Sequence, residues 1–131
     1  NYDWKHLPTA ADHASAAKNP TPYRKYTVLY SGRGNGGQAL IQQIKLALAA
    51  STPVAIGLHV RQGFEDLSPE HPVDYDVKTP ILGGHGVIAL GYDSEGLIVE
   101  NSWGTIWGDK GFGKLSWAVV AKDVIGADVV H

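Results

Sequence analysis

The feature that most constrains the fold is one amphipathic helix followed by a series of short strands. Apolar residues recur at spacings of three and four between Gln38 and Ser51, which predicts a helix with one buried side. Directly after it, large and small residues alternate in the segment PVAIGLHV, as in a half-buried strand. We interpret the rest of the chain as strands and connections. A helix followed by antiparallel strands predicts an α+β fold, in which a curled sheet or barrel packs against one main helix over about residues 37–51.

The other predicted elements are short. The segment YTVLY predicts a strand before the helix, and HGVIALGY, LIVEN and FGKLSW predict three strands after it. Near the N-terminus, prolines flank a short helix that Thr9 caps. We therefore expect an irregular arm over residues 1–24 and a β-rich unit over residues 25–131.

Charge and composition argue against several classes of function. The 131 residues include 11 basic and 13 acidic side chains, which gives a formal net charge of −2, and the basic residues are scattered. Proteins that bind nucleic acids carry a basic stripe or patch, so no nucleic-acid partner is expected. The apolar runs are far shorter than the roughly 20 residues of a membrane span, so no membrane partner is expected either. An apolar content of 44% with 18% charged residues indicates a compact folded unit.

Cysteine and methionine are both absent from the sequence. The chain therefore offers no disulfide, no thiolate metal site and no cysteine nucleophile. With no initiator methionine and no charged-then-apolar leader, we expect a piece of a longer precursor or a trimmed chain. Neither a cofactor nor a metal is predicted. Asp74 and Asp76 are interpreted as part of a solvated loop, and five histidines without ligand spacing are assigned to surface or packing roles: His6, His13, His59, His71 and His131.

A glycine-rich segment before the main helix admits two interpretations. Gly32, Gly34 and Gly37 match the G-x-G-x-x-G fingerprint of dinucleotide-binding folds, between a predicted strand and a helix. The next strand, however, ends at Val60 and Arg61, where that fingerprint requires an acidic residue for the ribose. We therefore favour a flexible turn whose amides cap the helix.

A second motif is much more specific. The segment GGHGV opens an apolar strand that ends in GY, and NSWG begins sixteen residues after the histidine. A second WG pair and a GF pair follow. These elements, in this order, resemble the second half of the papain-like cysteine peptidases. The resemblance extends from about residue 37 to residue 117, and it is loose in the N-terminal arm and in the last dozen residues.

The resemblance implies a role for each residue of the motif. His85 would be the catalytic base, and Asn101 would orient it. Trp103 would cover their hydrogen bond from water, with Ser102 in the same supporting segment. Trp107 would flank the cleft on the leaving side of the peptide.

The resemblance also implies a substrate pocket. Gly57, Gly84 and Gly86 would line the pocket for the second residue before the cleaved bond. Because glycines leave such a pocket wide, we expect it to accept bulky apolar side chains such as leucine or phenylalanine.

The residue types suit the implied chemistry, because an asparagine can accept from one imidazole nitrogen without adding charge and leave the other nitrogen to a thiol. The spacing fits less well. With a three-residue turn and a left-handed Gly96, Asn101 lies opposite Ala89. That position is four residues, about 13 Å, from His85. A bulge or bend is required, and the glycines on either side of the histidine could permit one.

The nucleophile of the family is not part of this sequence. In papain-like enzymes the cysteine begins a helix in the first half of the domain, and an upstream glutamine completes the oxyanion hole. Three accounts are open: the His/Asn half of a two-chain enzyme, an excised fragment, or a non-catalytic relative that acts as a protein-binding module.

The first account is the one we expect. It implies peptide-bond hydrolysis by a Cys-His-Asn mechanism on a peptide or protein substrate. The cysteine would come from a Cys-bearing N-terminal half, which is either a separate partner chain or a removed segment. An inhibitor or a neutralising protein is a further candidate partner. The chain alone would be inactive. The absence of disulfides favours a microbial secreted protein or an effector delivered into another cell.

Overall fold

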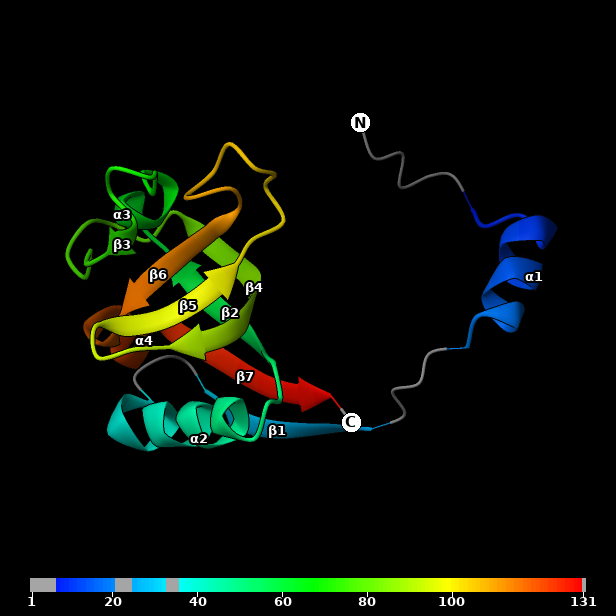
Figure 1. The fold of residues 1–131 in the computed structure, drawn as a ribbon, viewed down its shortest axis with the longest axis horizontal. Helices are drawn as coiled ribbons and strands as arrows, with labels where there is room; N and C mark the ends of the chain where they lie inside the picture. The colour runs from blue at the N-terminus through cyan, green and yellow to red at the C-terminus, as the bar shows by residue number, and fades with distance from the viewer. Residues whose placement is uncertain (1–6, 21–24, 33–35, 131) are drawn as a thin grey trace.

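A computed structural model describes residues 7–20, 25–32 and 36–130. It confirms the α+β fold, with a single seven-stranded sheet in the order β1-β7-β2-β4-β5-β6-β3 (Figure 1). The strands are β1 (Tyr26–Ser31), β2 (Val54–Val60), β3 (Val73–Asp74), β4 (Gly83–Tyr92), β5 (Gly96–Glu100), β6 (Phe112–Ser116) and β7 (Val124–Val130). The helices are α1 (Ala10–Lys18), α2 (Gly37–Ala49), α3 (Gln62–Glu65) and α4 (Trp117–Asp123).

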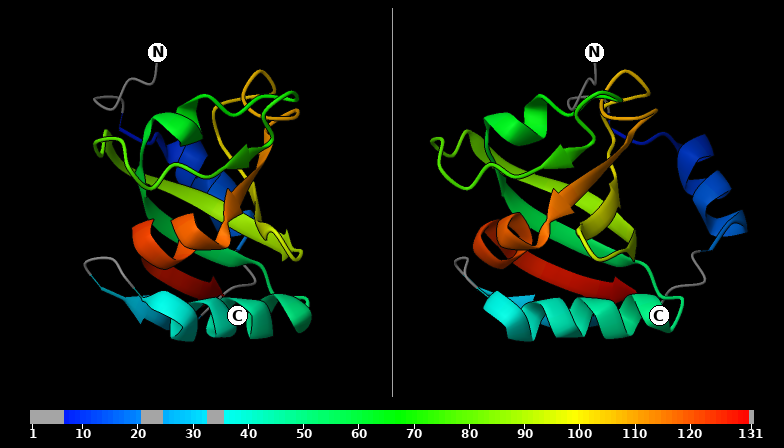
Figure 2. Two further views of the ribbon diagram at one scale, coloured as in Figure 1. Left: turned by 90° about the vertical axis from the view of Figure 1, so that its left-hand side faces the viewer. Right: turned by 60° about the vertical axis from the view of Figure 1, so that its left-hand side comes forward.

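One face of the sheet is covered by α2 and α4, which lie side by side (Figure 2). Leu40, Ile41 and Ile44 form the buried side of α2, at the predicted helical spacing. On β2 the burial alternates residue by residue, so that Ile56 and Leu58 point into the same core. Each such side chain stabilises the fold by about 1.5–3 kcal/mol when it is fully buried.

The opposite face of the sheet carries a continuous row of paired residues across five strands. The pairings join in turn Val28, Asp128, Ala55, Ile88 and Glu100. Val28 and Ile88 are both exposed on this face. We call it the outer face.

The C-terminal part of the fold differs from the prediction that only strands follow the main helix. The strand predicted through Trp117 ends at Ser116, whose hydroxyl accepts a hydrogen bond from the Val119 N–H and caps α4. β7 then returns between β1 and β2 and pairs with both. Residues 124–130 therefore form an internal strand of the sheet.

The connection between β2 and β4 is also more structured than predicted. It contains α3 and β3, and Asp74 in β3 is only 3% exposed. The interpretation of Asp74 as part of a solvated loop is therefore wrong. The Thr9 cap of α1 is present as predicted, in a reciprocal pair with Asp12. Gly34 of the glycine-rich segment lies outside the described residues.

Candidate active site

The hairpin of β4 and β5 brings the predicted pair of residues together. Its register shifts between Ala89 and Gly91, which leaves Leu90 as a bulge on β4. Glu100 consequently pairs with Ile88, and Asn101 follows it, near the start of β4. A bulge adds one residue to one strand and turns the following residues to the other face. The bulge thus moves Asn101 toward His85 and onto the same face.

The origin of this register differs from the prediction in two ways. The bulge lies at Leu90, and not at the glycines beside His85. Gly96 does not have a positive φ; instead, a Cβ atom there would lie 2.1 Å from the carbonyl oxygen of Leu115. Gly96 is needed because β6 passes close to the turn, and Asn101 does not lie opposite Ala89.

A hydrogen bond joins the two side chains. The distance from His85 Nε2 to Asn101 Oδ1 is 2.7 Å. The backbone N–H of Ser102 donates to the same Oδ1 at 2.8 Å, which identifies that atom as an acceptor. His85 Nε2 must therefore carry the proton in this bond. The neutral ring then has its free lone pair on Nδ1, where it can accept a proton.

Trp103 packs on the imidazole of His85. The two ring centroids are 4.7 Å apart with an interplanar angle of 36°. Trp103 is 41% exposed, so its other side faces solvent. An indole in this place covers one side of the imidazole.

Trp107 has a different place from the one expected. It is only 6% exposed, and its indole N–H donates to the carbonyl oxygen of Phe64 at 2.9 Å. It meets Trp103 edge to face, with 6.1 Å between ring centroids. Trp107 therefore supports Trp103 from the interior, and little of its surface is available to a passing peptide.

Phe64 is the residue of this site that sequence reasoning missed. It is completely buried, and its ring centroid lies 5.9 Å from that of His85, 5.4 Å from Trp103 and 4.8 Å from Trp107. The only signal in the sequence is a lone aromatic residue just after β2. Phe64 forms the base of an aromatic cluster on which the imidazole rests.

The amide nitrogen of Asn101 is an unusual feature of the site. Nδ2 is buried and has no hydrogen-bond partner among the described residues. An unsatisfied buried donor costs about 1–3 kcal/mol. Asn101 thus orients His85 at some expense of stability, a pattern found at functional sites.

A pocket of about 530 Å³ opens on the outer face beside this pair. Gly57 and Gly86 line it, together with Ala55, Ile88 and Asp128. Gly84 is not among the lining residues, so its assignment to the pocket is not supported by the geometry. In the described part of the chain, no three acidic or histidine side chains lie close enough to hold a metal ion. None of the described helices is both long and apolar enough to cross a membrane.

The sequence profile of the papain family cysteine proteases matches residues 2–128, nearly the whole chain. The chain belongs to this family. An uncharacterised peptidase C1-like protein of Acanthamoeba polyphaga mimivirus is 31% identical over 96 residues, which cover 67% of this chain and 30% of that protein. Cysteine proteinase 2 of Zea mays is 33% identical over 78 residues, which cover 56% of this chain and 22% of that protein.

Solved structures of papain-like proteases share the fold. Xylellain, a cysteine protease from Xylella fastidiosa, superposes with a TM-score of 0.74 at 19% identity, over 95% of this chain and 45% of its own. The bromelain protease from Ananas comosus gives a TM-score of 0.55 at 19% identity, over 80% of this chain and 48% of its own. The chain thus spans less than half the length of these papain-like relatives.

Proposed function

We propose that this chain is the His/Asn half of a cysteine endopeptidase and that its nucleophilic thiol is supplied by a Cys-bearing half. The observation that carries the proposal is the bond from His85 Nε2 to Asn101 Oδ1, which leaves Nδ1 unprotonated in the neutral ring. A base held in one tautomer by a third group is the arrangement that activates a nucleophile.

The proposed mechanism follows from that tautomer. Nδ1 of His85 accepts the thiol proton, and the Nε2–H of the resulting imidazolium continues to donate to Asn101 Oδ1. The thiolate attacks the scissile carbonyl carbon, and the tetrahedral intermediate collapses as Nδ1–H gives its proton to the leaving amine. Water then attacks the thioester with His85 as the base, which releases the acid and restores the thiol. Trp103 and Phe64 keep the imidazole in one orientation through both steps.

Exposed apolar residues on the outer face favour a binding partner for this chain. Besides Val28 and Ile88, the paired residues Tyr26 and Val130 are also exposed there. Contiguous exposed apolar surface is characteristic of an interface. We propose that the Cys-bearing half covers part of this face, next to the pocket.

The test of the proposed function combines the two halves. We expect no peptidase activity from the purified chain, and activity after the Cys-bearing half is added under reducing conditions. A denatured and rapidly diluted sample of this chain serves as the control. If the mixture forms a stable complex but cleaves no peptide in a broad substrate library, the chain is a non-catalytic relative that acts as a binding module.

A second prediction concerns the pocket. Gly126, Gly57 and Gly86 pair in turn across three strands, and none of them has a positive φ. A Cβ atom at Gly57 would meet only ordinary contacts, the nearest at 3.8 Å. Glycines that the backbone does not require often mark close approach of another group. Gly57→Val should therefore fold normally and narrow the pocket.

The measurement for this variant is kcat/KM of the combined enzyme with substrates that differ at the second residue before the cleaved bond. For leucine or phenylalanine at that position, we expect transition-state stabilisation to fall by about 1–3 kcal/mol relative to alanine. Gly84→Val, on the same strand as Gly86 and outside the pocket lining, should leave the preference unchanged. Equal preferences in wild type and Gly57→Val would exclude Gly57 from the substrate pocket.

A further inference from the structure

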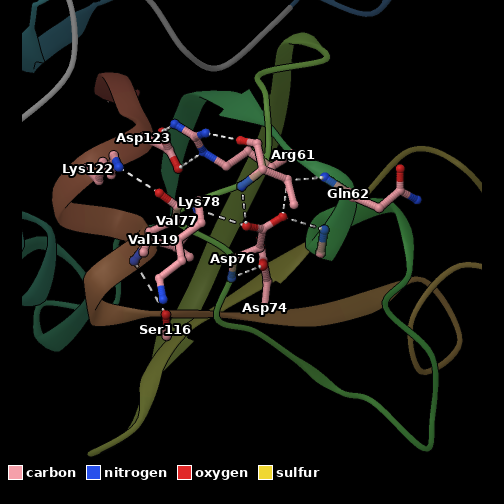
Figure 3. Close-up of polar contacts among 12 residues, drawn as sticks. Arg61, Gln62, Asp74, Asp76, Val77, Lys78, Ser116, Val119, Lys122 and Asp123 are labelled. Atoms are coloured by element: carbon pink, nitrogen blue, oxygen red, sulfur yellow. Dashed lines mark hydrogen bonds and ion pairs between the residues drawn. The ribbon is translucent and has the colours of Figure 1, made fainter.

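A buried carboxyl group, that of Asp74, lies close to the aromatic cluster of Phe64, Trp103 and Trp107. Asp74 in β3 is 3% exposed and lies next to Asp76, where β3 pairs with β6 (Figure 3). Its Oδ1 accepts the backbone N–H of Asp76 at 2.8 Å. The proposed mechanism makes no use of this group.

The charged neighbours of Asp74 do not offer it a free cation. Arg61 at the end of β2 binds Asp123 of α4 through two bonds of 2.8 and 2.9 Å, and its remaining terminal nitrogen donates to the Thr79 carbonyl oxygen. Asp76 adds a second carboxylate, held by the N–H groups of residues 78 and 79. Lys114 of β6, the strand paired with β3, is half-buried, but it is bound to Asp93 and Glu95. The other charged side chains of the nearby elements are exposed: Glu65, Asp66, Lys78 and Lys122.

Burial raises the pKa of Asp74 to about 6, against the hydrogen bond from the Asp76 N–H, which lowers it. Repulsion from Asp76 and Asp123 also raises this pKa, and the charge of Arg61 lowers it. The pKa of Asp76 is lowered, first by the hydroxyl of Thr79. Of the two carboxyl groups, Asp74 is the one that changes charge in mildly acidic solution.

Gly63 connects this group to His85. A Cβ atom on Gly63 would lie 2.4 Å from Asp74 Oδ1, so the first turn of α3 rests directly on this carboxyl group. The N–H of Gly63 also donates to Asp76 Oδ2 at 3.2 Å. The next residue is Phe64, which packs against His85 and Trp103 and accepts the indole N–H of Trp107. Two consecutive residues, Gly63 and Phe64, therefore link the carboxyl group to the imidazole.

We propose that Asp74 is a pH-dependent positioning residue, whose neutral form seats α3 so that Phe64 holds His85 and Trp103 in place. The folded state binds the Asp74 proton more tightly than the unfolded chain does, so its contribution is present at acidic pH and is lost as the pH rises from about 4 through 6. Above that range the Asp74 carboxylate repels Asp76 and Asp123, and α3 packs less tightly against β3.

The test compares wild type, Asp74→Asn and the matched control Glu70→Gln, an exposed carboxyl group in the same connection. Hydrogen exchange of the Trp107 indole N–H reports the position of α3 directly, because this group donates to the Phe64 carbonyl oxygen in α3. Between pH 5 and pH 7.5, after correction for intrinsic exchange, we expect its protection to fall about tenfold in wild type and in Glu70→Gln. In Asp74→Asn, which mimics the neutral acid, protection should stay constant.

Two further readouts keep the proposal open to refutation. Amides of the distant core, such as those of α2, should not show the tenfold loss, because the proposed change is local. The carboxyl carbon of Asp74 in the wild-type chain should titrate near pH 6, and this needs no variant. Titration below pH 5, or equal pH dependence of indole protection in wild type and Asp74→Asn, would overturn the proposal.

The catalytic arm of the test rests on the proposed function. In the complete peptidase, Asp74→Asn should extend the high-kcat range toward neutral pH and leave KM unchanged. A peptidase that is active but has identical pH profiles in the two forms would contradict the role of Asp74 alone. A complex without activity but with the expected indole exchange would contradict the proposed function alone.

Discussion

Replacing His85 by alanine in the complete peptidase is expected to lower kcat/KM about 10⁴-fold. In the proposed mechanism the imidazole takes the thiol proton and later protonates the leaving amine, so both transfers fail without it. KM should change little, because the ring is not part of the pocket lining. Steady-state kinetics with a fluorogenic peptide will measure the effect.

Asn101→Ala is expected to have a smaller effect than His85→Ala. It removes the acceptor for His85 Nε2 but leaves the ring packed on Trp103 and Phe64. We expect a loss of about 10²-fold, since the base is misoriented rather than absent. It also removes the unpaired Nδ2 atom, so the stability should change little. Near wild-type turnover in the His85 variant would end the assignment of His85 as the base.

Phe64→Ala is expected to lower the free energy of unfolding by about 3–5 kcal/mol. The ring is fully buried, and its removal leaves a cavity beneath three aromatic rings. Because a domain of this size is stable by about 5–15 kcal/mol, the variant should stand close to its unfolding transition at 37 °C. Urea unfolding monitored by tryptophan fluorescence will measure it.

Phe112→Ala is the matched control, because Phe112 is 42% exposed at the start of β6. Its loss should cost about 1 kcal/mol or less. If the two variants unfold at the same urea concentration, Phe64 is not the base of the aromatic cluster.

Periodicity was sufficient to predict the main helix and the strands that pack on it. The spacing of Leu40, Ile41 and Ile44 corresponds to the buried side of α2, and the alternation along β2 is reproduced at every residue. These segments bury one face each, so their sequence pattern reflects their surroundings. The pairing of His85 with Asn101 followed from the resemblance to a family, not from spacing.

Other features depend on contacts that a local pattern does not contain. The bulge at Leu90 has no glycine or turn residue at its own position to signal it. In α4 two adjacent valines favour a strand, and only the capping residue Ser116 indicated a helix. Asp74 lies in a polar, proline-marked segment, and it is buried where β3 pairs with β6 and α3 rests on its carboxyl group. Phe64 contributes to the site through packing, for which no motif exists.

If His85 activates a thiol on the Cys-bearing half, as proposed, the rate at which iodoacetamide alkylates that thiol will depend on His85. An ordinary cysteine, with a pKa near 8.5, is almost entirely protonated at pH 6, whereas one beside an imidazolium is a thiolate there. At pH 6 we expect the thiol to react at least about tenfold faster in the complex with the wild-type chain than in either of two other samples. These are the complex with the His85→Ala chain and the Cys-bearing half alone. Equal alkylation rates in the three samples would contradict the proposed role of His85.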